Sequence, residues 1–430
     1  MIFITETEET GKSNQQNLVA DDNIGHYLAK IYDPNLRNLV KKCFQCGQCS
    51  GICQLSKVQK FAPSRIIQLI LEGFESEVLE NGDLWSCLMC NTCMQDCPQN
   101  VNFADLVRMA KYKARTLNGV YLDDRIAHNK IYHIVSELES QPFIQPNRDL
   151  AWIPEGCSVS DQGHTMFFVG CLPFFEFDFP NITSIAKSTL QLLSQLEVDP
   201  IVVRKDEVCC GHDLYWGQAD LWDFIKLAKK NYKLFTKAGV STIVTACAEG
   251  YEMLKVEYPK LFDDFAEKFD VKHIIEYVYD KWKEGKLTFK TAPEENSDNI
   301  FTYHDPCRLS RFLPKDNPIL DKVREIFDHL QSLGYNFKEM EHNREHGLCC
   351  GICSWMNCSD TSTGLRYKRV LEAKNVGAQQ MWTSCPKCKM HFTCLKNQFP
   401  EFSSIEIRDF TEFMLDFIQT ENNPSGSVAE

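Results

Sequence analysis

The sequence lacks the features that define several common protein classes. No stretch approaches the roughly 18 consecutive apolar residues of a membrane-spanning helix, and the N-terminal segment MIFITETEETGKSNQQ has no basic region or long apolar core that would direct export. There is no GxGxxG after a predicted strand and no P-loop. Lys and Arg number 46 against 59 Asp and Glu, a net charge of −13, which disfavours nucleic acid as a partner. We therefore expect a cytoplasmic protein that has no transmembrane segment of its own and binds other proteins.

Cysteine, in contrast, is abundant. The chain has 21 cysteines among 430 residues. Because nothing in the sequence directs export, grouped cysteines are expected to be metal ligands or redox centres rather than disulfides. The length predicts two or three domains.

Eight cysteines form two runs with the spacing of bacterial ferredoxins. The runs are C-x2-C-x2-C-x3-C, and the second ends in Cys97-Pro98. In such runs three cysteines bind one cluster and the fourth binds the other. We assign one [4Fe–4S] cluster to Cys43, Cys46, Cys49 and Cys97, and a second to Cys53, Cys87, Cys90 and Cys93. Structural zinc is the alternative, although its four-cysteine sites usually consist of two separated CxxC pairs.

Beyond about residue 164 the cysteines mark an internal duplication. The first copy contains TMFFVGC, VCCG and TIVTACAEG, and the second contains IFTYHDPC, LCCG and MWTSCPKC. Corresponding cysteines lie 136, 140 and 138 positions apart: Cys171 and Cys307, Cys209 and Cys349, Cys247 and Cys385. In both copies a β-rich run leads into a cysteine, and helix-like stretches such as 218–238 and 362–376 lie between. This pattern predicts α/β units that present cysteines at the carboxyl ends of strands.

The two copies differ in the number of thiols. The second copy supplies five: Cys307, Cys349, Cys350, Cys385 and Cys388. A cubane needs only four, so an adjacent cysteine pair with three further thiols suggests a cluster of unusual shape. The first copy supplies four, Cys171, Cys209, Cys210 and Cys247, and has Gly250 at the fifth position.

These motifs resemble the CCG-domain proteins typified by the catalytic subunit of heterodisulfide reductase. The segments FQCGQCSGIC and LWSCLMCNTCMQDCPQNV are similar to the small ferredoxin subunit of that enzyme, so the chain resembles a fused form over about residues 35–415. The resemblance implies that the five thiols of the second copy hold a noncubane [4Fe–4S] cluster that takes part in cleaving a disulfide by one-electron steps. For the first copy a cubane cluster, zinc or a purely structural role all remain open, with His212 or Asp213 as substitute ligands.

Several other residues lie close to the proposed ligands in the sequence. Arg308, Arg311, Lys387 and Lys389 either stabilise reduced clusters and bind an anionic thiol, or are surface charges. His304 and Asp305 either hydrogen-bond near the ligands or stabilise a turn. We assign no ligand role to Cys157, Cys353, Cys358 and Cys394. Cys353 and Cys358 follow the CCG closely and either line the site or are buried, unreactive thiols.

The expected fold is α+β with α/β units: an α-helical 2[4Fe–4S] ferredoxin-like domain followed by two tandem α/β CCG domains. The expected segments are a flexible tail (1–25), the ferredoxin-like domain (26–118) with helices at 63–73 and 103–117, a linker (119–163), the first CCG domain (164–292), a polar boundary (293–299), the second CCG domain (300–420) and a flexible tail (421–430).

Two functions are compatible with this organisation. The first is a heterodisulfide reductase-like subunit that passes electrons to the CCG region and reduces a disulfide. The second is an electron-transfer subunit of an anaerobic or quinone-linked dehydrogenase, without a substrate of its own. Both imply a multisubunit complex with redox partners: a flavoprotein, a hydrogenase, a dehydrogenase, or a membrane quinone or haem subunit that would hold the chain at a membrane.

Overall fold

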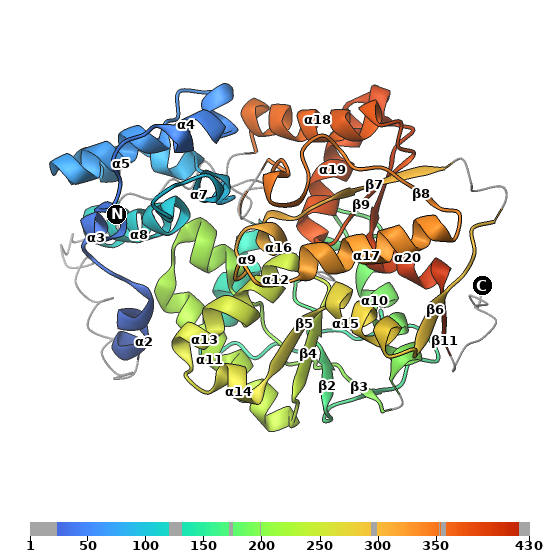
Figure 1. Cartoon of the computed structure of the whole chain (residues 1–430). Helices are drawn as coiled ribbons and strands as arrows, with labels where there is room; N and C mark the ends of the chain where they lie inside the picture. Colours follow the sequence, from blue (N-terminus) through green and yellow to red (C-terminus); the bar gives the residue numbers. More distant parts are fainter. Residues whose placement is uncertain are drawn as a thin grey trace, which may run out of the picture.

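The computed structural model describes residues 24–119, 131–171, 175–197, 199–293, 299–351, 353 and 358–420. Figure 1 shows an N-terminal helical block (blue) beside two α/β halves, the first in green to yellow and the second in orange to red. Within the described residues no helix is both long and apolar enough to cross a bilayer. The predicted tail at 421–430 and most of the one at 1–25 lie outside the described residues.

The N-terminal block consists of short helices around the two ferredoxin-type runs. Its α-helices are α2 (Ile24–Ile31), α3 (Leu36–Val40), α4 (Gln48–Ile52), α5 (Pro63–Glu72), α6 (Glu75–Glu80), α7 (Thr92–Gln95) and α8 (Phe103–Asn118), with 3-10 turns at Leu55–Lys57 and Gly82–Ser86. Pro63 begins α5, and Gly73, in the left-handed conformation at φ 94°, ends it. The Asn102 side chain accepts a hydrogen bond from the Asp105 nitrogen and caps α8. The helices predicted at 63–73 and 103–117 are confirmed.

The first half is a parallel sheet with helices on both faces. Its strands are β1 (Val159–Ser160), β2 (Thr165–Phe167), β3 (Ile201–Val202), β4 (Thr242–Thr245) and β5 (Asp270–His273), in the order β1-β3-β2-β4-β5. Its helices are α9 (Ile131–Ser140), α10 (Ser184–Leu196), α11 (Leu221–Ala238), α12 (Ala248–Glu252), α13 (Tyr258–Leu261), α14 (Phe265–Lys268) and α15 (Ile274–Lys283), with π-helical turns at Asp213–Gln218 and Met253–Glu257. The strand β6 (Leu287–Phe289) follows α15.

The second half repeats this arrangement. Its strands are β7 (Ile300–His304), β8 (Asn336–Phe337), β9 (Gln380–Thr383) and β10 (Glu406–Asp409), all parallel and in the order β10-β9-β7-β8. Its α-helices are α16 (Cys307–Ser310), α17 (Ile319–Ser332), α18 (Asp360–Asn375), α19 (Pro386–Gln398) and α20 (Phe410–Phe417), with 3-10 turns at Arg344–His346 and Pro400–Phe402. The last strand, β11 (Ile418–Thr420), follows α20.

Both sheets change winding direction at the same place. From β2 the chain crosses to β3 on one side and then returns to β4 on the other, and from β7 it crosses to β8 and returns to β9 in the same way. The crevice outside the carboxyl ends of the strands at such a switch point is where open α/β sheets bind ligands. The predicted cysteine positions follow these strand ends.

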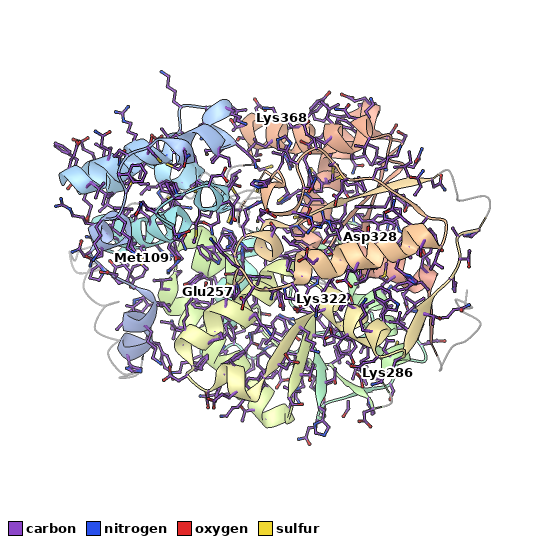
Figure 2. All side chains as sticks on the ribbon, in the orientation of Figure 1. Met109, Glu257, Lys286, Lys322, Asp328 and Lys368 are labelled. Atoms are coloured by element: carbon purple, nitrogen blue, oxygen red, sulfur yellow. The ribbon has the colours of Figure 1, made fainter. Side chains whose placement is uncertain are left out.

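The two halves pack through equivalent elements. Helix α10 packs on α20, and α17, the counterpart of α10, packs on α15, the counterpart of α20. Lys322 of α17, labelled in Figure 2, lies 2.9 Å from Asp280 of α15. The corresponding terminal strands β6 and β11 pair antiparallel with each other. These reciprocal contacts are those of an approximate two-fold relation, as in a symmetric dimer.

The structure differs from expectation in the stretch 119–163, which the sequence pattern predicts to be a linker. Within its described part, α9 packs on α11 and β1 joins the first sheet beside β3. Arg148 forms buried ion pairs with Glu139 and Glu207, at 3.0 Å each. These contacts make the stretch part of the first half. Of the predicted boundary at 293–299, residues 294–298 lie outside the described residues.

Candidate functional site

Four cysteines of the N-terminal block line one cavity. These are Cys53, Cys87, Cys90 and Cys93, which the cysteine spacing assigns to the second [4Fe–4S] cluster. Apolar side chains such as Phe61 and Phe103 form much of the remaining wall. Burial raises the pKa of Cys87 well above its usual range and also raises the pKa values of Cys53 and Cys93, so these three thiols need a cation or a metal to remain deprotonated in this cavity.

The two runs share one loop geometry. In the first, Gln45 has a φ of 60° and its backbone nitrogen donates to the Cys43 sulfur at 3.4 Å. In the second, Met89 has a φ of 44° and donates in the same way to Cys87, also at 3.4 Å. The left-handed residue turns the chain tightly and directs an N–H group at a sulfur, an interaction that tunes the potential of a thiolate-bound cluster.

The other assigned set lies nearer the surface. Cys43, Cys46 and Cys49 lie close together. The pKa of Cys49 is raised first by burial and then by the neighbouring Cys43 thiol, with a smaller contribution from Cys46. Cys97 follows α7, and its sulfur accepts a hydrogen bond from the Val101 nitrogen at 3.3 Å. Helix α4 packs on α7, so the two runs lie side by side.

The five cysteines of the second half converge at the switch point of its sheet. Cys307 follows β7, Cys349 and Cys350 follow the loop after β8, and Cys385 and Cys388 follow β9. All except Cys307 are buried. Hydrogen bonds link Cys307 to Cys349, Cys349 to Cys350, Cys350 to Cys388, and Cys388 to Cys385.

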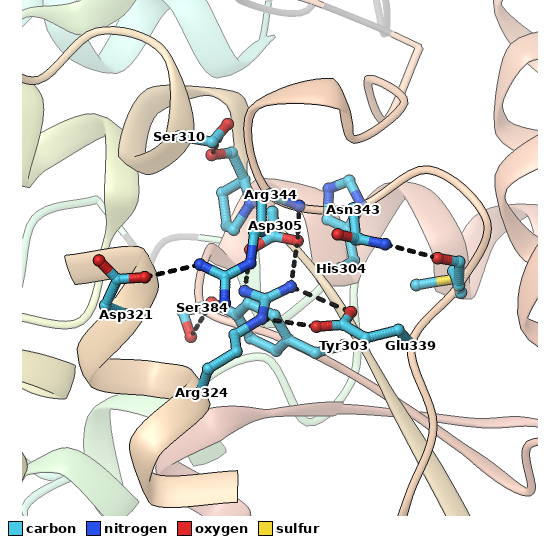
Figure 3. A network of polar contacts seen from close by, with 12 residues as sticks. Tyr303, His304, Asp305, Ser310, Asp321, Arg324, Glu339, Asn343, Arg344 and Ser384 are labelled. Carbon is cyan, nitrogen blue, oxygen red and sulfur yellow. Dashed lines mark hydrogen bonds and ion pairs between the residues drawn. The ribbon is translucent and has the colours of Figure 1, made fainter. Parts of the chain in front are cut away.

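A buried carboxylate holds the loops of this set. Figure 3 shows Asp305, two residues before Cys307, bound by the Arg324 guanidinium, with one N–O distance of 2.8 Å. The Asp305 carboxylate also accepts a hydrogen bond from the Arg344 backbone nitrogen at 2.8 Å, in the loop that leads to Cys349. Burial alone would raise the pKa of Asp305, but Arg324 keeps it below its usual value. The carboxylate therefore fixes one cysteine loop relative to another.

Arg311 connects the second half to the N-terminal block. Its Nε donates to the Cys90 carbonyl oxygen at 2.6 Å, and Nη1 donates to the carbonyl oxygens of Glu345 and Gly347, both at 2.9 Å. In return, the Asn91 side chain donates to the Arg311 carbonyl oxygen at 3.1 Å. Arg311 is thus a buried clasp between two cysteine loops and not a surface charge.

At this clasp the two sets of cysteines touch. The Cys90 thiol hydrogen-bonds with the Cys349 thiol, and this bond, together with Arg311 and Thr92, lowers the pKa of Cys90 to about 5 against the effect of burial. The Cys349 backbone nitrogen donates to Gln54, which follows Cys53, at 3.2 Å. One side of the N-terminal cysteine cavity therefore abuts the five-thiol set.

The four cysteines of the first half also line one cavity, together with side chains of the second half. Cys171, Cys209, Cys210 and Cys247 share it with His212, Asp213, Glu249, Gly250, Pro386 and Lys387. Hydrogen bonds from Cys171 and Cys210 lower the pKa of Cys209. Among the described residues that line the cavity there is no fifth thiol, because Gly250 stands where the second half has Cys388.

Equivalent residues of the two halves meet beside this cavity. The Cys247 thiol contacts the Cys385 thiol, its counterpart in the repeat. Glu249 lies 2.7 Å from its own counterpart, Lys387, which also lies 2.7 Å from Asp213. His212, Asp213 and Glu249 are close enough to bind a metal ion together, but the Lys387 ammonium already bridges both carboxylates.

The remaining residues singled out from the sequence have mostly structural contacts. His304 accepts a hydrogen bond from Arg369 at 3.0 Å, and Lys389 pairs with Glu412 at 2.6 Å. The buried Arg308 guanidinium stacks 3.9 Å from the Phe312 ring centre and lies 3.8 Å from the Cys353 sulfur. Cys157 and Cys394 are partly buried and Cys358 is exposed.

The side chains lining these cavities fit iron–sulfur clusters. Each cavity gathers soft thiol donors from separate loops, with mostly apolar walls in the N-terminal block and with His212, Asp213, Glu249 and Lys387 beside the thiols in the first half, and thiolates are the ligands that such clusters require. Sequence reasoning missed Gln54, Asn91 and Arg324, whose roles depend on long-range contacts. Of the residues that hold the cysteine loops together between the two parts, Arg311 could be singled out from the sequence, because it lies close to Cys307 there.

Comparison with known families agrees with this arrangement. Residues 39–101 match the 4Fe-4S dicluster domain, and residues 165–255 and 301–393 each match the cysteine-rich domain named CCG. The chain is 27% identical over 341 residues to one subunit of the dihydromethanophenazine:CoB–CoM heterodisulfide reductase from Methanosarcina acetivorans, covering 77% of this chain and 76% of that protein. The chain is an iron–sulfur protein similar to heterodisulfide reductase.

Other relatives of this chain belong to further redox systems. One subunit of the fumarate reductase (CoM/CoB) from Methanothermobacter marburgensis is 25% identical over 82% of this chain and 67% of its own length. An EtfAB:quinone oxidoreductase from Syntrophomonas wolfei is 23% identical over 73% of this chain and 43% of its own length. The relatives are oxidoreductases with different named substrates, which supports the class of redox electron-transfer subunits.

Proposed function

We propose that this chain is a heterodisulfide reductase-like subunit of a larger redox complex. Cys43, Cys46, Cys49 and Cys97 would hold one [4Fe–4S] cluster, and Cys53, Cys87, Cys90 and Cys93 a second. Cys307, Cys349, Cys350, Cys385 and Cys388 would hold a noncubane [4Fe–4S] cluster. These groups would supply one-electron redox chemistry, so that a disulfide takes up two electrons and two protons and leaves as two thiols.

The observation that carries this proposal is the contact between Cys90 and Cys349. It joins the N-terminal cavity to the five-thiol set through a hydrogen bond between two thiols, with Arg311 and Asn91 holding the two loops together. An electron on the N-terminal block would thus reach the second half without crossing solvent. A protein with independent metal sites would not need its ligands to touch.

The second half supplies a suitable electrostatic environment for an anionic cluster. A hydrogen bond from Cys349, together with Arg308 and Arg311, lowers the pKa of Cys307. Hydrogen bonds from Cys349 and Cys388 lower the pKa of Cys350, whose sulfur also lies 3.4 Å from the Nδ1 atom of His391. These contacts favour the thiolate, the form that binds iron, at Cys307 and Cys350, while the same hydrogen bonds raise the pKa of their donors Cys349 and Cys388.

A second candidate function rests on Gly250 and on one relative. Four thiols in the first half would support a cubane cluster, zinc or no metal, and the similar EtfAB:quinone oxidoreductase is named for a quinone. An electron-transfer subunit of a quinone-linked dehydrogenase, without a disulfide substrate, is the alternative. Its partner would be a flavoprotein, a dehydrogenase or a membrane quinone or haem subunit.

Anaerobic iron analysis with EPR tests the proposal. We expect about 12 irons per chain, 8 from the N-terminal block and 4 from the second half, or about 16 if the first half also holds a cluster. Cys350→Ser should lose about 4 irons and the EPR signal that does not come from the ferredoxin-type clusters. The matched control Cys394→Ser should keep both, because this partly buried thiol accepts a hydrogen bond from Gln398 and is no proposed ligand. A wild-type count near 8, or an unchanged Cys350→Ser, would contradict the proposal.

Disulfide reductase assays then separate the two functions. The intact complex should reduce a mixed disulfide of two thiol cofactors, and Cys350→Ser should abolish this while leaving the ferredoxin-type EPR signals unchanged. Absence of disulfide reduction by a fully loaded complex that still reduces a quinone would favour the second candidate.

A further inference from the structure

The two ferredoxin-type runs differ in their access to solvent. In the first run Cys46 is exposed and Cys43 and Cys49 are partly exposed. In the second run Cys87 is buried, and Cys90 contacts the second half. Among the proposed ligand sets, the one around the first run is therefore the set nearest the surface.

The segment that carries this run is basic in an acidic protein. Between residues 34 and 71 there are six cationic side chains and no Asp or Glu, whereas the whole chain has a net charge of −13. The rest of the chain thus carries −19. All six cations are exposed: Arg37, Lys41, Lys42, Lys57, Lys60 and Arg65.

These cations belong to neighbouring elements. Helices α3 and α4 both pack on α5. Figure 1 shows α3 and α5 on the outer side of the N-terminal block, whereas α4 extends towards α18 of the second half. None of the six forms an ion pair within the part of the chain that the structure describes, whereas Lys113 and Arg115 of α8 both pair with carboxylates. The segment therefore presents exposed cations outside ion pairs, although Lys60 and Arg65 share a surface cavity with Glu77 and Asp83.

An apolar side chain lies within this charged surface. Phe44, between Cys43 and the exposed Cys46, is 60% exposed. Val58, in the same segment, is 38% exposed. Exposed cations with few exposed apolar side chains, beside the proposed cluster ligands of the first run, suit a small and short-lived interface that forms quickly by electrostatic attraction.

We propose that this surface, defined by Phe44 and the six cations, docks an acidic one-electron carrier protein whose redox group lies at its own surface. The inference rests on the proposed function, since it requires the first run to hold a redox group. In each encounter the carrier loses one electron and the chain gains one, or the reverse. Lys41 and Lys42, in the turn that leads into Cys43, guide the encounter, and Phe44 makes the central contact.

Stopped-flow electron transfer from two probes tests this surface. The first probe is a pre-reduced acidic plant-type ferredoxin, and the second is the methyl viologen radical cation, which has the opposite charge. With the ferredoxin, Lys41→Glu/Lys42→Glu should lower the second-order rate constant at low salt by about tenfold, and the rate should depend less on ionic strength. With methyl viologen the rate should not fall.

Lys286→Glu is a charge-reversal control at a single position, with half the charge change of Lys41→Glu/Lys42→Glu. Lys286 is exposed and lies in the first half near β6, far from the N-terminal block (Figure 2). Lys286→Glu should leave the rate constant with ferredoxin within about twofold of wild type, because salt screens the interaction between charges more than about 10 Å apart. Phe44→Ala should slow the ferredoxin reaction without changing its salt dependence.

The outcomes separate this inference from the proposed function. A chain that methyl viologen cannot reduce would lack working clusters, which overturns both. A chain that methyl viologen reduces normally, but whose ferredoxin rate is unchanged by Lys41→Glu/Lys42→Glu, overturns only the docking surface. Binding to phosphatidylserine vesicles that depends on Lys41 and Lys42, with no effect on the ferredoxin rate, would assign the surface to a membrane instead.

Discussion

At the scale of single residues, Gly250 distinguishes the first half of the repeat from the second, which has a cysteine at the equivalent position. Its nitrogen donates to the Cys247 sulfur at 3.4 Å, and its backbone is that of an ordinary helix residue. A Cβ atom at this position would lie 3.5 Å from Thr245 Oγ1 and 3.6 Å from Cys247 Cβ, which are ordinary contact distances. The first half therefore lacks a thiol but not the backbone that would present one.

Restoring that thiol gives the first residue-scale prediction. Gly250→Cys should raise the iron content from about 12 to about 16 per chain, because it completes a second five-thiol set. Iron analysis and EPR of the anaerobically reconstituted protein measure the change. Gly250→Ala controls for the loss of glycine in α12 and should leave the count at about 12. A wild type with about 16 irons would mean that Gly250 never limited cluster binding.

At the scale of elements, corresponding helices keep their caps but change the chemistry of the capping residue. His273 caps α15 and Asp409 caps α20, each with a glutamate three residues later that returns a hydrogen bond. Burial lowers the pKa of His273 to about 4, so it caps as a neutral ring. Burial, and repulsion by Glu412, raise the pKa of Asp409 to about 7.

The raised pKa of Asp409 predicts how stability changes with pH. An unfolded Asp titrates near 4 and the folded one near 7, so the folded state binds more protons between these values. This group therefore makes folding less favourable as the pH rises from about 4 to about 7, by an amount on the order of a few kcal/mol. Asp409→Asn removes the titration and keeps an oxygen that accepts from the Thr411 nitrogen.

Thermal unfolding at two pH values measures this effect. The Tm of Asp409→Asn minus the Tm of wild type should be larger at pH 8 than at pH 5. This difference should grow between about pH 4 and 7. The exposed Asp321→Asn serves as a control and should show no such dependence. An equal change of Tm at both pH values would show that Asp409 is already ionised at pH 5.

At the scale of the whole molecule, local patterns were predictable and long-range contacts were not. Pro63 and Gly73 mark the ends of α5 in the sequence, and β-rich runs predict β4, β7 and β9. The strand β1 has only two residues, too few for a recognisable pattern, and so its stretch reads as a linker. Its role comes from pairing with β3, which the sequence does not encode locally.

The same distinction holds for the candidate site. Cysteine spacing groups thiols that share a loop or a repeat, because neighbours in a tight turn must be close in space. The contacts between Cys90 and Cys349, and between Cys247 and Cys385, depend on how separate units pack. Arg311 binds three backbone carbonyl oxygens, which leave no signal in residue type. The internal repeat identifies the cysteines of each set, but only the packing of the units shows which sets lie next to one another.

That packing makes Arg311 the point at which the N-terminal block can be uncoupled from the second half. Arg311→Met would leave the carbonyl oxygens of Cys90, Glu345 and Gly347 without their buried donor, which should cost on the order of 3 kcal/mol of stability. The iron count should remain about 12, because no proposed ligand changes.

Freeze-quench EPR after rapid reduction by methyl viologen measures the coupling. In the wild type, electrons should spread from the ferredoxin-type clusters to the second half, and in Arg311→Met the ferredoxin-type signals should accumulate first. Arg344→Met is the control, since its guanidinium pairs with the exposed Asp321 while its backbone nitrogen still binds Asp305. If Arg311→Met spreads electrons as fast as wild type, the Cys90–Cys349 contact is not the route between the two parts. Electrons would then have to cross elsewhere, and the order of the cysteine sets in space would not be their order in electron transfer.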